Sequence, residues 1–261
     1  YACTAGSFQN IRKRTHARTA QEMEDELATG ILADLIRGQN ESKPVASVME
    51  VHREAITAPC LRDLLKKLSE CDLRVHRMAS EEVLDWAKEN ARDELETYHF
   101  NKVIKLQGSE SLWREALKTY SDLKVYGLSP SNYTFSILIS ACGRNGRWEE
   151  ALKAFDDMKE NNVSPDLMTF GAIISVCEKG GQWKEAFKAW EDMKEAGIIA
   201  NVITYNSLIG TCDKADQWEE AFKVWEHMKA AGVQGDKFTY STIIRLYKKR
   251  GQWQEALKVF E

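Results

Sequence analysis

The sequence predicts an all-α protein, a right-handed superhelical solenoid of stacked helix-turn-helix repeats. Three observations predict this fold. Tryptophan recurs every 35 residues without an insertion, each 35-residue unit holds two apolar stripes with helical spacing, and each unit closes on residues that stop helices. The tryptophans are Trp113, Trp148, Trp183, Trp218 and Trp253. One hairpin cannot bury both stripes, so we expect successive hairpins to stack, each touching mainly its neighbours.

The composition is that of a folded soluble protein. The chain has 261 residues, of which 43% are hydrophobic and 29% charged. Apolar runs such as SILISAC are far shorter than the roughly 20 residues that a membrane-spanning helix needs. The net charge of −4 lies in residues 1–96, with 14 basic and 18 acidic side chains, whereas residues 97–261 carry 22 of each. The neutral repeats argue mildly against strong nonspecific affinity for RNA.

The first 20 residues, YACTAGSFQNIRKRTHARTA, contain no acidic side chain and are rich in Arg, Ser, Thr and Ala. This composition is typical of an organelle transit segment or its remnant, and equally of a basic arm that grips a partner. We expect the arm to contact another molecule. The chain begins at Tyr1 rather than Met and ends at Glu261 within a repeat, so we expect a processed or partial chain.

Residues 21–96 form a helical region that follows the repeat pattern less well. Amphipathic segments lie at MEDELATGILADLI, CLRDLLKKLSEC and SEEVLDWAKENA, and Pro44 and Pro59 are breaks between helices. The last two segments could pair as a degenerate hairpin that caps the stack, since the terminal units of solenoids are atypical.

Residues 97–261 divide into five repeats in one register. The repeats are 97–131, 132–166, 167–201, 202–236 and the truncated 237–261. In the second repeat, Phe135, Leu138, Ile139 and Cys142 form the apolar stripe of a first helix. After the break at GRNGR, the stripe of the second helix is Trp148, Ala151, Leu152, Phe155 and Met158. Asn161 and Asn162 with Pro165 close this repeat, as Gly127, Gly197 and Gly232 close other repeats.

The periodic tryptophans and cysteines are best explained as core. Each Trp opens a second helix one turn before a small Ala, so we expect it to pack between hairpins rather than against a ligand. Cys142, Cys177 and Cys212 share the period, and equivalent positions in adjacent helices lie about 8–10 Å apart, beyond disulfide reach. We expect these three thiols to be buried and unpaired, in a reducing compartment.

The 35-residue period, openings such as VITYNSLIGTC, second helices such as WEEALKAFDDMK and the closing NNVSPD resemble the pentatricopeptide repeat family, with P-type 35-residue repeats. The resemblance covers residues 97–261 and is highly specific because it involves several units. It implies binding of single-stranded RNA, usually an organellar transcript, with one base read by each repeat.

The resemblance also implies which side chains read the bases. The reading pair is the fifth residue of a unit and its last residue, which gives Asn101 with Ser131, Ser136 with Asp166, Gly171 with Asn201, and Asn206 with Asp236; Ser241 lacks its partner. By the family's pattern the pairs suggest, 5′ to 3′, a pyrimidine with C favoured, then G, weakly A, then U. Gly171 departs from the usual Ser, Thr or Asn, which leaves the third base open. The carboxylate of Asp166 is a sensible acceptor for the N1–H and N2–H of guanine.

Two further ladders share the period. The second residue of each unit would sandwich the bases, or would be partly buried between first helices: Tyr98, Tyr133, Met168, Ile203 and Phe238. Cations near the ends of the first helices would contact phosphates, or would complement the helix macrodipole: Arg144, Lys179, Lys214 and Lys249. Ser109 breaks this second ladder in the first unit.

The sequence gives little support to catalysis, and we expect neither an enzyme nor a cofactor. His16, His52, His76, His99 and His227 fall in no metal-ligand spacing, no cysteines form a CxxC pair, and there is no glycine-rich phosphate loop.

Two functions stay open. One is the sequence-specific binding of single-stranded RNA in a mitochondrion or plastid, for transcript processing, stability or translation. The other is a non-catalytic scaffold subunit of a large organellar assembly, such as a ribosome or a membrane complex, which would use the repeats and residues 1–20 to hold protein. Four bases recur by chance about once per 256 bases, which is too often to specify one transcript and favours the scaffold. The reading pairs favour RNA.

Overall fold

The computed structural model describes residues 20–40, 44–70 and 74–260, which are helical apart from short connections and contain no strand. The chain forms two compact units, Tyr1–Val103 and Ile104–Glu261. The predicted basic arm, residues 1–20, lies outside the described residues except for Ala20, where the first helix begins. The prediction of an all-α repeat protein is confirmed.

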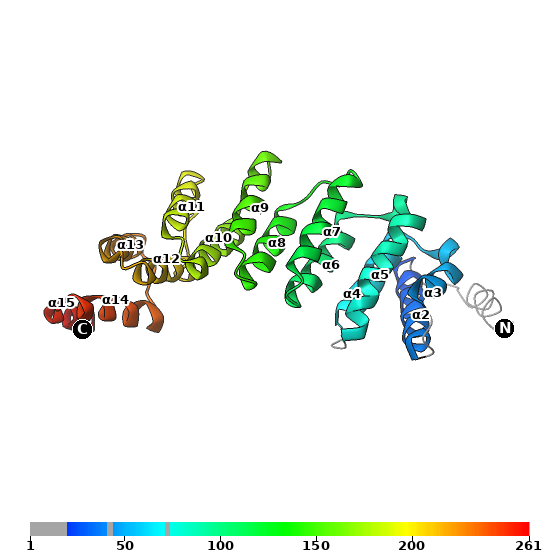
Figure 1. Ribbon diagram of the computed structural model, residues 1–261, viewed down its shortest axis with the longest axis horizontal. Coiled ribbons are helices and arrows are strands. Elements are labelled where there is room, and N and C mark those ends of the chain that lie inside the picture. Colours follow the sequence, from blue (N-terminus) through cyan, green and yellow to red (C-terminus); the bar gives the residue numbers. More distant parts are fainter. Residues whose placement is uncertain (1–19, 41–43, 71–73, 261) are drawn as a thin grey trace. The chain divides into compact units, whose positions relative to one another are not determined.

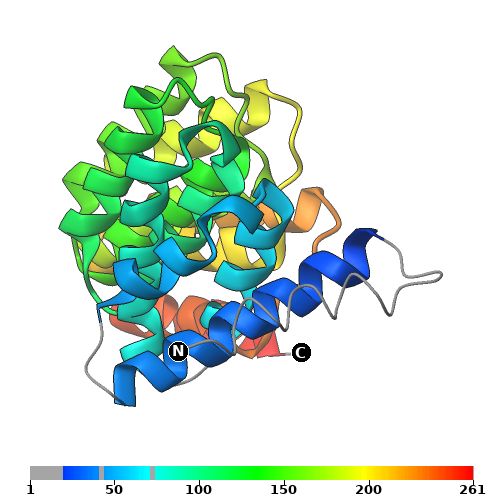
Figure 2. The ribbon, with the colours of Figure 1, turned by 90° about the vertical axis from the view of Figure 1, so that its right-hand side faces the viewer.

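The first unit is a small helical bundle. Its longest helix, α2, is the long blue helix of Figure 2 and packs against α4. The buried side chains of the unit include Ile31 and Leu35 on α2 and Leu61, Leu64 and Leu68 on α4. The elements are α2 (Ala20–Asn40), α3 (Val45–Val51), η1 (Arg53–Ala55), α4 (Ala58–Glu70), α5 (Arg74–Asn90) and η2 (Arg92–Glu94), followed by the start of α6 (Thr97–Ser109). The segments predicted at 60–71 and 80–91 thus correspond to α4 and α5, which pack against each other.

A buried histidine joins α6 to α4 within this unit. The backbone N–H of Glu96 donates to Nδ1 of His99 at 2.9 Å, so Nε2 carries the proton and donates to the carbonyl oxygen of Ala58 at 3.1 Å. The side chain is completely buried, and burial lowers the pKa of His99. His99 is therefore a neutral structural group.

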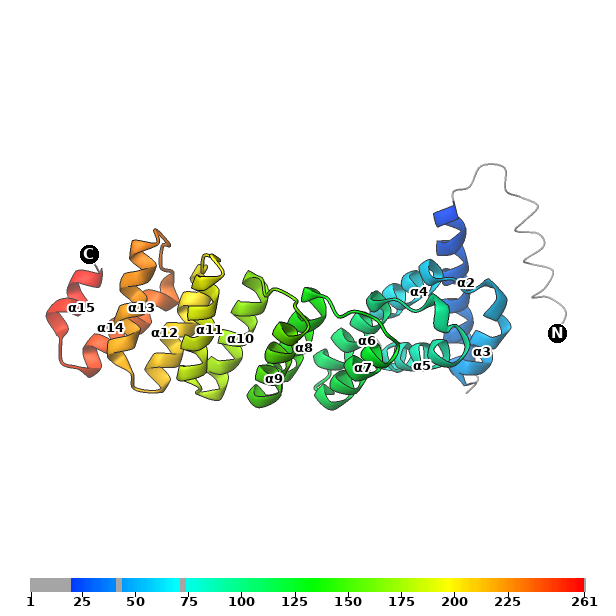
Figure 3. The ribbon, with the colours of Figure 1, turned by 90° about the horizontal axis from the view of Figure 1, so that it is seen from above.

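The second unit is a row of helical hairpins (Figure 1). Its helices after α6 are α7 (Trp113–Val125), α8 (Asn132–Arg144), α9 (Trp148–Glu160), α10 (Leu167–Gly180), α11 (Trp183–Glu195), α12 (Val202–Lys214), α13 (Trp218–Ala230), α14 (Lys237–Lys249) and α15 (Trp253–Phe260). Each second helix begins at a periodic tryptophan, as predicted. The hairpins α8–α9, α10–α11, α12–α13 and α14–α15 pack internally, and the first helices of successive hairpins contact one another, α8 with α10, α10 with α12 and α12 with α14. Figure 3 shows the hairpins following one another in chain order.

Left-handed residues follow the second helices α7, α9, α11 and α13. Gly127, Gly197 and Gly232 have φ of 72°, 69° and 70°, and Asn162 occupies the equivalent place with φ of 56°. Glycine reaches this conformation without a steric penalty, and Asn tolerates it better than most residues. The stops predicted from the sequence are therefore C-terminal helix caps.

The core of the second unit runs through all of its hairpins as one cluster. Phe135, Phe170 and Tyr205 occupy the same place in successive first helices and are at most 2% exposed. Cys142, Cys177 and Cys212 are completely buried free thiols, as predicted. Burial raises the pKa of Cys142 to about 11 and of the other two to about 12, so the thiols stay protonated and inert.

The tryptophans pack between hairpins, as predicted. The indole of Trp148 is partly buried against the core and lies beside Gly180 of the next hairpin, where an added Cβ would come within 2.8 Å of the ring. Arg147 lies over the ring of Trp113 at 4.8 Å, and Arg250 over that of Trp218 at 4.3 Å. These rings are covered from the following repeat and are not free to stack on a ligand.

Candidate nucleic-acid interface

The last residue of each repeat is the N-cap of the next first helix. Ser131, Asp166, Asn201 and Asp236 all have extended backbone, and the side-chain oxygen of each accepts the N–H of a threonine three residues on, at 2.8–3.3 Å. These threonines are Thr134, Thr169, Thr204 and Thr239, and all are completely or almost completely buried. Four predicted reading residues thus begin helices, while their side chains remain exposed.

Capping leaves each of these side chains some hydrogen-bonding capacity. Asp166 accepts the backbone N–H of Thr169 through Oδ1, so the acceptor Oδ2 is available to a ligand. Asn201 caps through Oδ1 in the same way, which leaves its amide N–H groups as donors. The chemistry offered at successive repeats therefore differs, although the capping is the same.

The fifth residues lie one turn further along the first helices. Ser136, Gly171 and Asn206 are half-buried, and Ser241 is exposed with its hydroxyl donating to the carbonyl of Phe238 at 2.9 Å. Asn101, in the first unit, is only 6% exposed, and its Oδ1 has no hydrogen-bond partner among the described residues. Asn101 and Ser131 belong to different compact units.

One predicted pair is joined directly. The Nδ2 of Asn206 lies 3.0 Å from both carboxylate oxygens of Asp236, and Oδ1 of Asn206 accepts from the hydroxyl of Thr239 at 2.5 Å. Thr169 follows Asp166 by three residues, as Thr239 follows Asp236. Its hydroxyl instead donates to Oδ1 of Asn132 at 2.6 Å. The second and fourth pairs therefore share an aspartate but present it differently.

An apolar side chain is exposed at the second residue of each first helix from α8 to α14. The exposed fractions are 53% for Tyr133, 70% for Met168, 67% for Ile203 and 47% for Phe238. Tyr98, at this position in the first unit, is partly buried, with Arg62 at 5.5 Å and Lys102 at 5.6 Å from its ring. Each of the four exposed side chains stands two residues after an N-cap, so apolar and polar groups share one end of every helix.

The predicted phosphate ladder is divided in two. Lys214 forms a salt bridge of 3.1 Å with Glu178, and Lys249 one of 2.7 Å with Asp213, in each case with the preceding first helix. Arg144 instead donates to the carbonyl oxygen of Gly108 at 3.3 Å, and Lys179 forms no salt bridge within the described part of the chain. Lys214 and Lys249 are thus paired with carboxylates, whereas Arg144 is bonded to a neutral carbonyl group.

Family comparison identifies the repeats. A pentatricopeptide repeat domain matches residues 118–180 and 153–215, the PPR repeat family matches residues 200–247, and a PPR repeat matches residues 238–261. Together these matches run from residue 118 to residue 261, more than half of the chain. The chain belongs to the pentatricopeptide repeat family. Comparison with curated protein sequences gave no significant match.

Solved pentatricopeptide repeat structures share the fold. The protein PPR10 in complex with an 18-nt psaJ RNA element has 23% sequence identity and a TM-score of 0.61, over 100% of this chain and 40% of that one. The pentatricopeptide repeat domain of Arabidopsis thaliana protein-only RNase P 1, in complex with tRNA, has 18% identity and a TM-score of 0.59, over 75% of this chain and 99% of that one. The chain therefore spans less than half the length of PPR10.

The described part of this pentatricopeptide repeat chain contains no group of three or more His, Cys, Asp or Glu side chains that could hold a metal ion. Among the same residues, no helix is both long enough and apolar enough to cross a bilayer.

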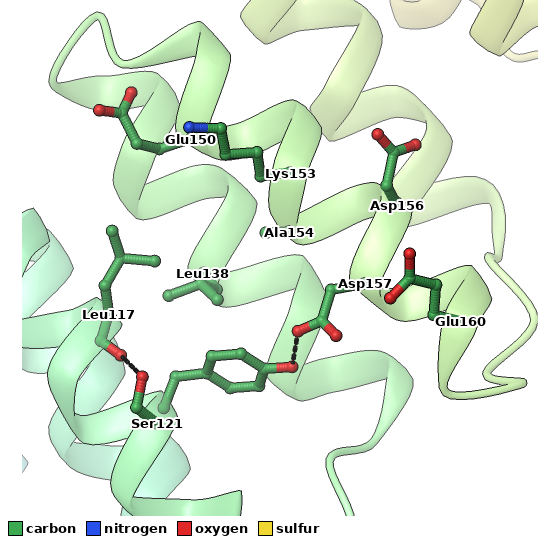
Figure 4. A pocket seen from close by; sticks show the side chains of 10 residues that line it. Leu117, Ser121, Leu138, Glu150, Lys153, Ala154, Asp156, Asp157 and Glu160 are labelled. Atoms are coloured by element: carbon green, nitrogen blue, oxygen red, sulfur yellow. Dashed lines mark hydrogen bonds between the residues drawn. The ribbon is translucent and has the colours of Figure 1, made fainter.

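The second helices carry a pocket that the sequence analysis did not single out. It measures about 540 Å³ and lies along α9 (Figure 4), where Leu117 and Leu138 meet the carboxylates of Glu150, Asp156 and Glu160. At its edge Asp157 accepts hydrogen bonds from Tyr120 and Lys124 of the preceding repeat. Partial burial acts to raise the pKa of Asp157, but these bonds outweigh it and hold the pKa below its usual range. Asp and Lys residues that recur with the 35-residue period were the sequence signal for these contacts. The contacts join successive second helices.

The capping of α14 predicts a specific pH dependence. The N–H of Thr239 donates to Asp236 and lowers the pKa of that carboxyl group, so the stabilisation is present above the unfolded pKa of about 3.9 and is lost as the pH falls through the folded value. Asn is an equally good N-cap and does not titrate. We expect D236N to melt close to the unsubstituted protein at pH 7 and to lose less Tm between pH 5 and pH 3.

Thermal unfolding followed by circular dichroism at both pH values measures this difference. Asp156→Asn, a change of an exposed carboxylate that caps no helix, is the control and should lose as much Tm as the unsubstituted protein. Equal losses in D236N and the unsubstituted protein would contradict the capping contribution.

Proposed function

We propose that this chain binds single-stranded RNA and reads one base with each repeat, in an organelle, during transcript processing, stability or translation. The observation that carries the proposal is the exposed apolar ladder of Tyr133, Met168, Ile203 and Phe238, with a polar N-cap two residues before each member. Solved structures with this fold include pentatricopeptide repeat proteins in complex with RNA, which supports the same use here.

The ladder fits unpaired bases for physical reasons. Side chains of this size exposed in a regular row cost free energy unless something covers them, and they mark binding surfaces. A base has an apolar face and a polar edge, so it can stack on one of these side chains while its edge meets the neighbouring N-cap. Stacking on a side chain contributes about 1–3 kcal/mol per base and tolerates any base. Selectivity would then come from the polar pairs.

The pairs support different bases. Asp166 has a free carboxylate oxygen beside the small Ser136, which suits the two donors of guanine. Asn206 and Asp236 suit uracil, as the family's pattern suggests. Gly171 leaves the third position weak, and an added Cβ there would meet only Thr204 Oγ1 at 3.7 Å, so packing does not impose the glycine.

A scaffold function is the second candidate, and one observation favours it. Lys214 and Lys249 already pair with carboxylates, so the first helices offer RNA less positive charge than the sequence suggested. A scaffold would use the same repeats to hold protein subunits of an organellar complex.

A titration with labelled RNA separates the two functions. A short single-stranded RNA with the order C, G, A, U is compared with one in which C replaces the G, at several salt concentrations. We expect the change to weaken binding by about 1–3 kcal/mol, roughly 5- to 150-fold. If both RNAs bind equally weakly at low salt, base reading is wrong and the scaffold takes its place.

A further inference from the structure

The first helices of repeats four and five carry cations that are neutralised from the preceding repeat. The Nζ of Lys214 lies 3.1 Å from Oε1 of Glu178. Asp213 receives two cations, Arg245 at 2.6 Å and Lys249 at 2.7 Å. The carboxylates are the more buried partners, since Glu178 is 19% and Asp213 11% exposed, whereas the three cations are about half exposed. The acids are therefore fixed parts of the surface, and the cations reach over to them.

The packing of the helices holds Glu178 in place. Gly210 of α12 lies directly against its carboxylate, and an added Cβ would come within 3.0 Å of Oε1 and 3.3 Å of Cδ. The glycine thus provides the space in which Glu178 meets Lys214. The pair depends on side chains from two repeats.

Repeats two and three differ because the twelfth residue of the preceding repeat, where Glu178 and Asp213 stand in later repeats, is glycine. The two first helices approach closely there: an added Cβ at Gly108 would lie 2.5 Å from Cβ of Ala141, and one at Gly143 would lie 2.1 Å from Cγ2 of Val176. No carboxylate fits at either position. Arg144 therefore keeps its full charge beside a backbone carbonyl, and Lys179 keeps its own.

We propose that Glu178 and Asp213 occupy the place that RNA phosphates would take on the cations of repeats four and five, so that backbone binding is concentrated on Arg144 and Lys179. This inference rests on the proposed binding of RNA. A phosphate approaching Lys214 must displace or lie beside a fixed carboxylate, which cancels most of the Coulomb attraction at this distance. The bonded pair of Asn206 and Asp236 would then meet its base with little help from the backbone.

Two lysines at the same position of consecutive repeats give the sharpest test. K179Q should weaken binding of all short RNAs alike and lower the log-log salt slope by about 0.7, the value for one phosphate contact on a single strand. The double substitution E178Q/K214Q, which removes the pair as a whole and leaves no unpaired carboxylate, should change affinity less than twofold and leave the slope unaltered. E178Q should strengthen binding by about two- to fivefold, the range of one exposed ion pair, and raise the slope by about 0.7. In the E178Q background, K214Q should then cost as much as K179Q does.

The control is E191Q, which removes an equal charge from a pair with Lys194 at 2.8 Å on a second helix. It should leave affinity nearly unchanged, and an effect equal to that of E178Q would show a general charge effect and overturn the proposal. Equal losses in K179Q and in E178Q/K214Q, with no gain in E178Q, would also overturn it while RNA binding stands. If the unsubstituted protein binds no RNA at low salt, the proposed function itself fails. Circular dichroism confirms that each variant is folded.

Discussion

Replacing Ser136 with Asn is expected to move the preference at one base from guanine toward uracil. The present pair combines the free Oδ2 of Asp166 with the small side chain of Ser136, and guanine brings two donors, N1–H and N2–H. In the pair of Asn206 and Asp236, the amide already occupies both carboxylate oxygens at 3.0 Å. Such a carboxylate has room for fewer further donors, and uracil brings one, N3–H.

The repeats that hold Ser136 and Asn206 also differ at their first residue, and this difference affects the result of the substitution. The hydroxyl of Thr169 donates to Asn132, whereas that of Thr239 donates to Asn206, and Val202 stands where Asn132 does. An Asn introduced at position 136 would compete with Asn132 for this hydroxyl. We therefore expect the double variant N132V/S136N to show the larger change.

Titration of labelled RNAs that differ at a single base measures the change. Relative affinity for guanine over uracil should fall by about 1–3 kcal/mol in the double variant and by less in S136N. Asn132→Val alone is the control and should keep the preference for guanine. An unaltered order of the four bases in the double variant would contradict the reading role of Ser136 and Asp166.

Replacing Phe170 with Ala is expected to cause the largest loss of stability. The ring is 2% exposed, lies edge-on to Phe155 with centroids 5.7 Å apart, and belongs to a cluster shared by all the hairpins of the second unit. Its helix, α10, contacts α8, α9, α11 and α12. Removing a buried phenyl ring costs about 3–5 kcal/mol, because the transfer free energy is lost and a cavity remains.

Thermal unfolding should show this loss as a fall in Tm of roughly 10 °C. Because a solenoid is held together by contacts between neighbouring repeats, we also expect the melting curve to broaden as the hairpins on either side uncouple. Ile199→Ala is the control, since that side chain is 75% exposed and its loss should cost less than about 0.5 kcal/mol. A change in F170A as small as in I199A would contradict the shared core.

The fold could be predicted from the sequence because every repeat states the same local preferences. The tryptophans mark the start of each second helix, and Gly127 and Asn162 mark the ends of two of them. One repeat alone would be weak evidence for these helices, but several repeats with the same pattern are strong evidence. Residues 21–96 have no such agreement. Their helices were recognisable from apolar spacing, but the boundary of the compact unit at Val103, within α6, had no sequence signal.

The sequence indicated which positions of each repeat belong to the candidate site, but not how their side chains interact. Counting positions located Asp166 and Met168, but no count shows that the last residue of a repeat caps the next helix. The salt bridge of Lys214 with Glu178 joins residues 36 apart, and it needs the space left by Gly210 as well as the charges. Interactions between repeats depend on how closely the helices approach, which a single sequence does not state.

The helix caps set a limit on how recognition can change in this protein. The residues that cap α8, α10, α12 and α14 each carry a short side chain with an acceptor oxygen, and Ser, Thr, Asp and Asn are the residues that supply one. A change at position 131, 166, 201 or 236 to a residue without such an oxygen costs about 0.5–2 kcal/mol of stability, and less for glycine, so few residues are well tolerated there. The fifth residues of the repeats cap no helix. Divergence toward new targets should therefore begin at Ser136, Gly171 and Asn206, with the caps following within their restricted choice.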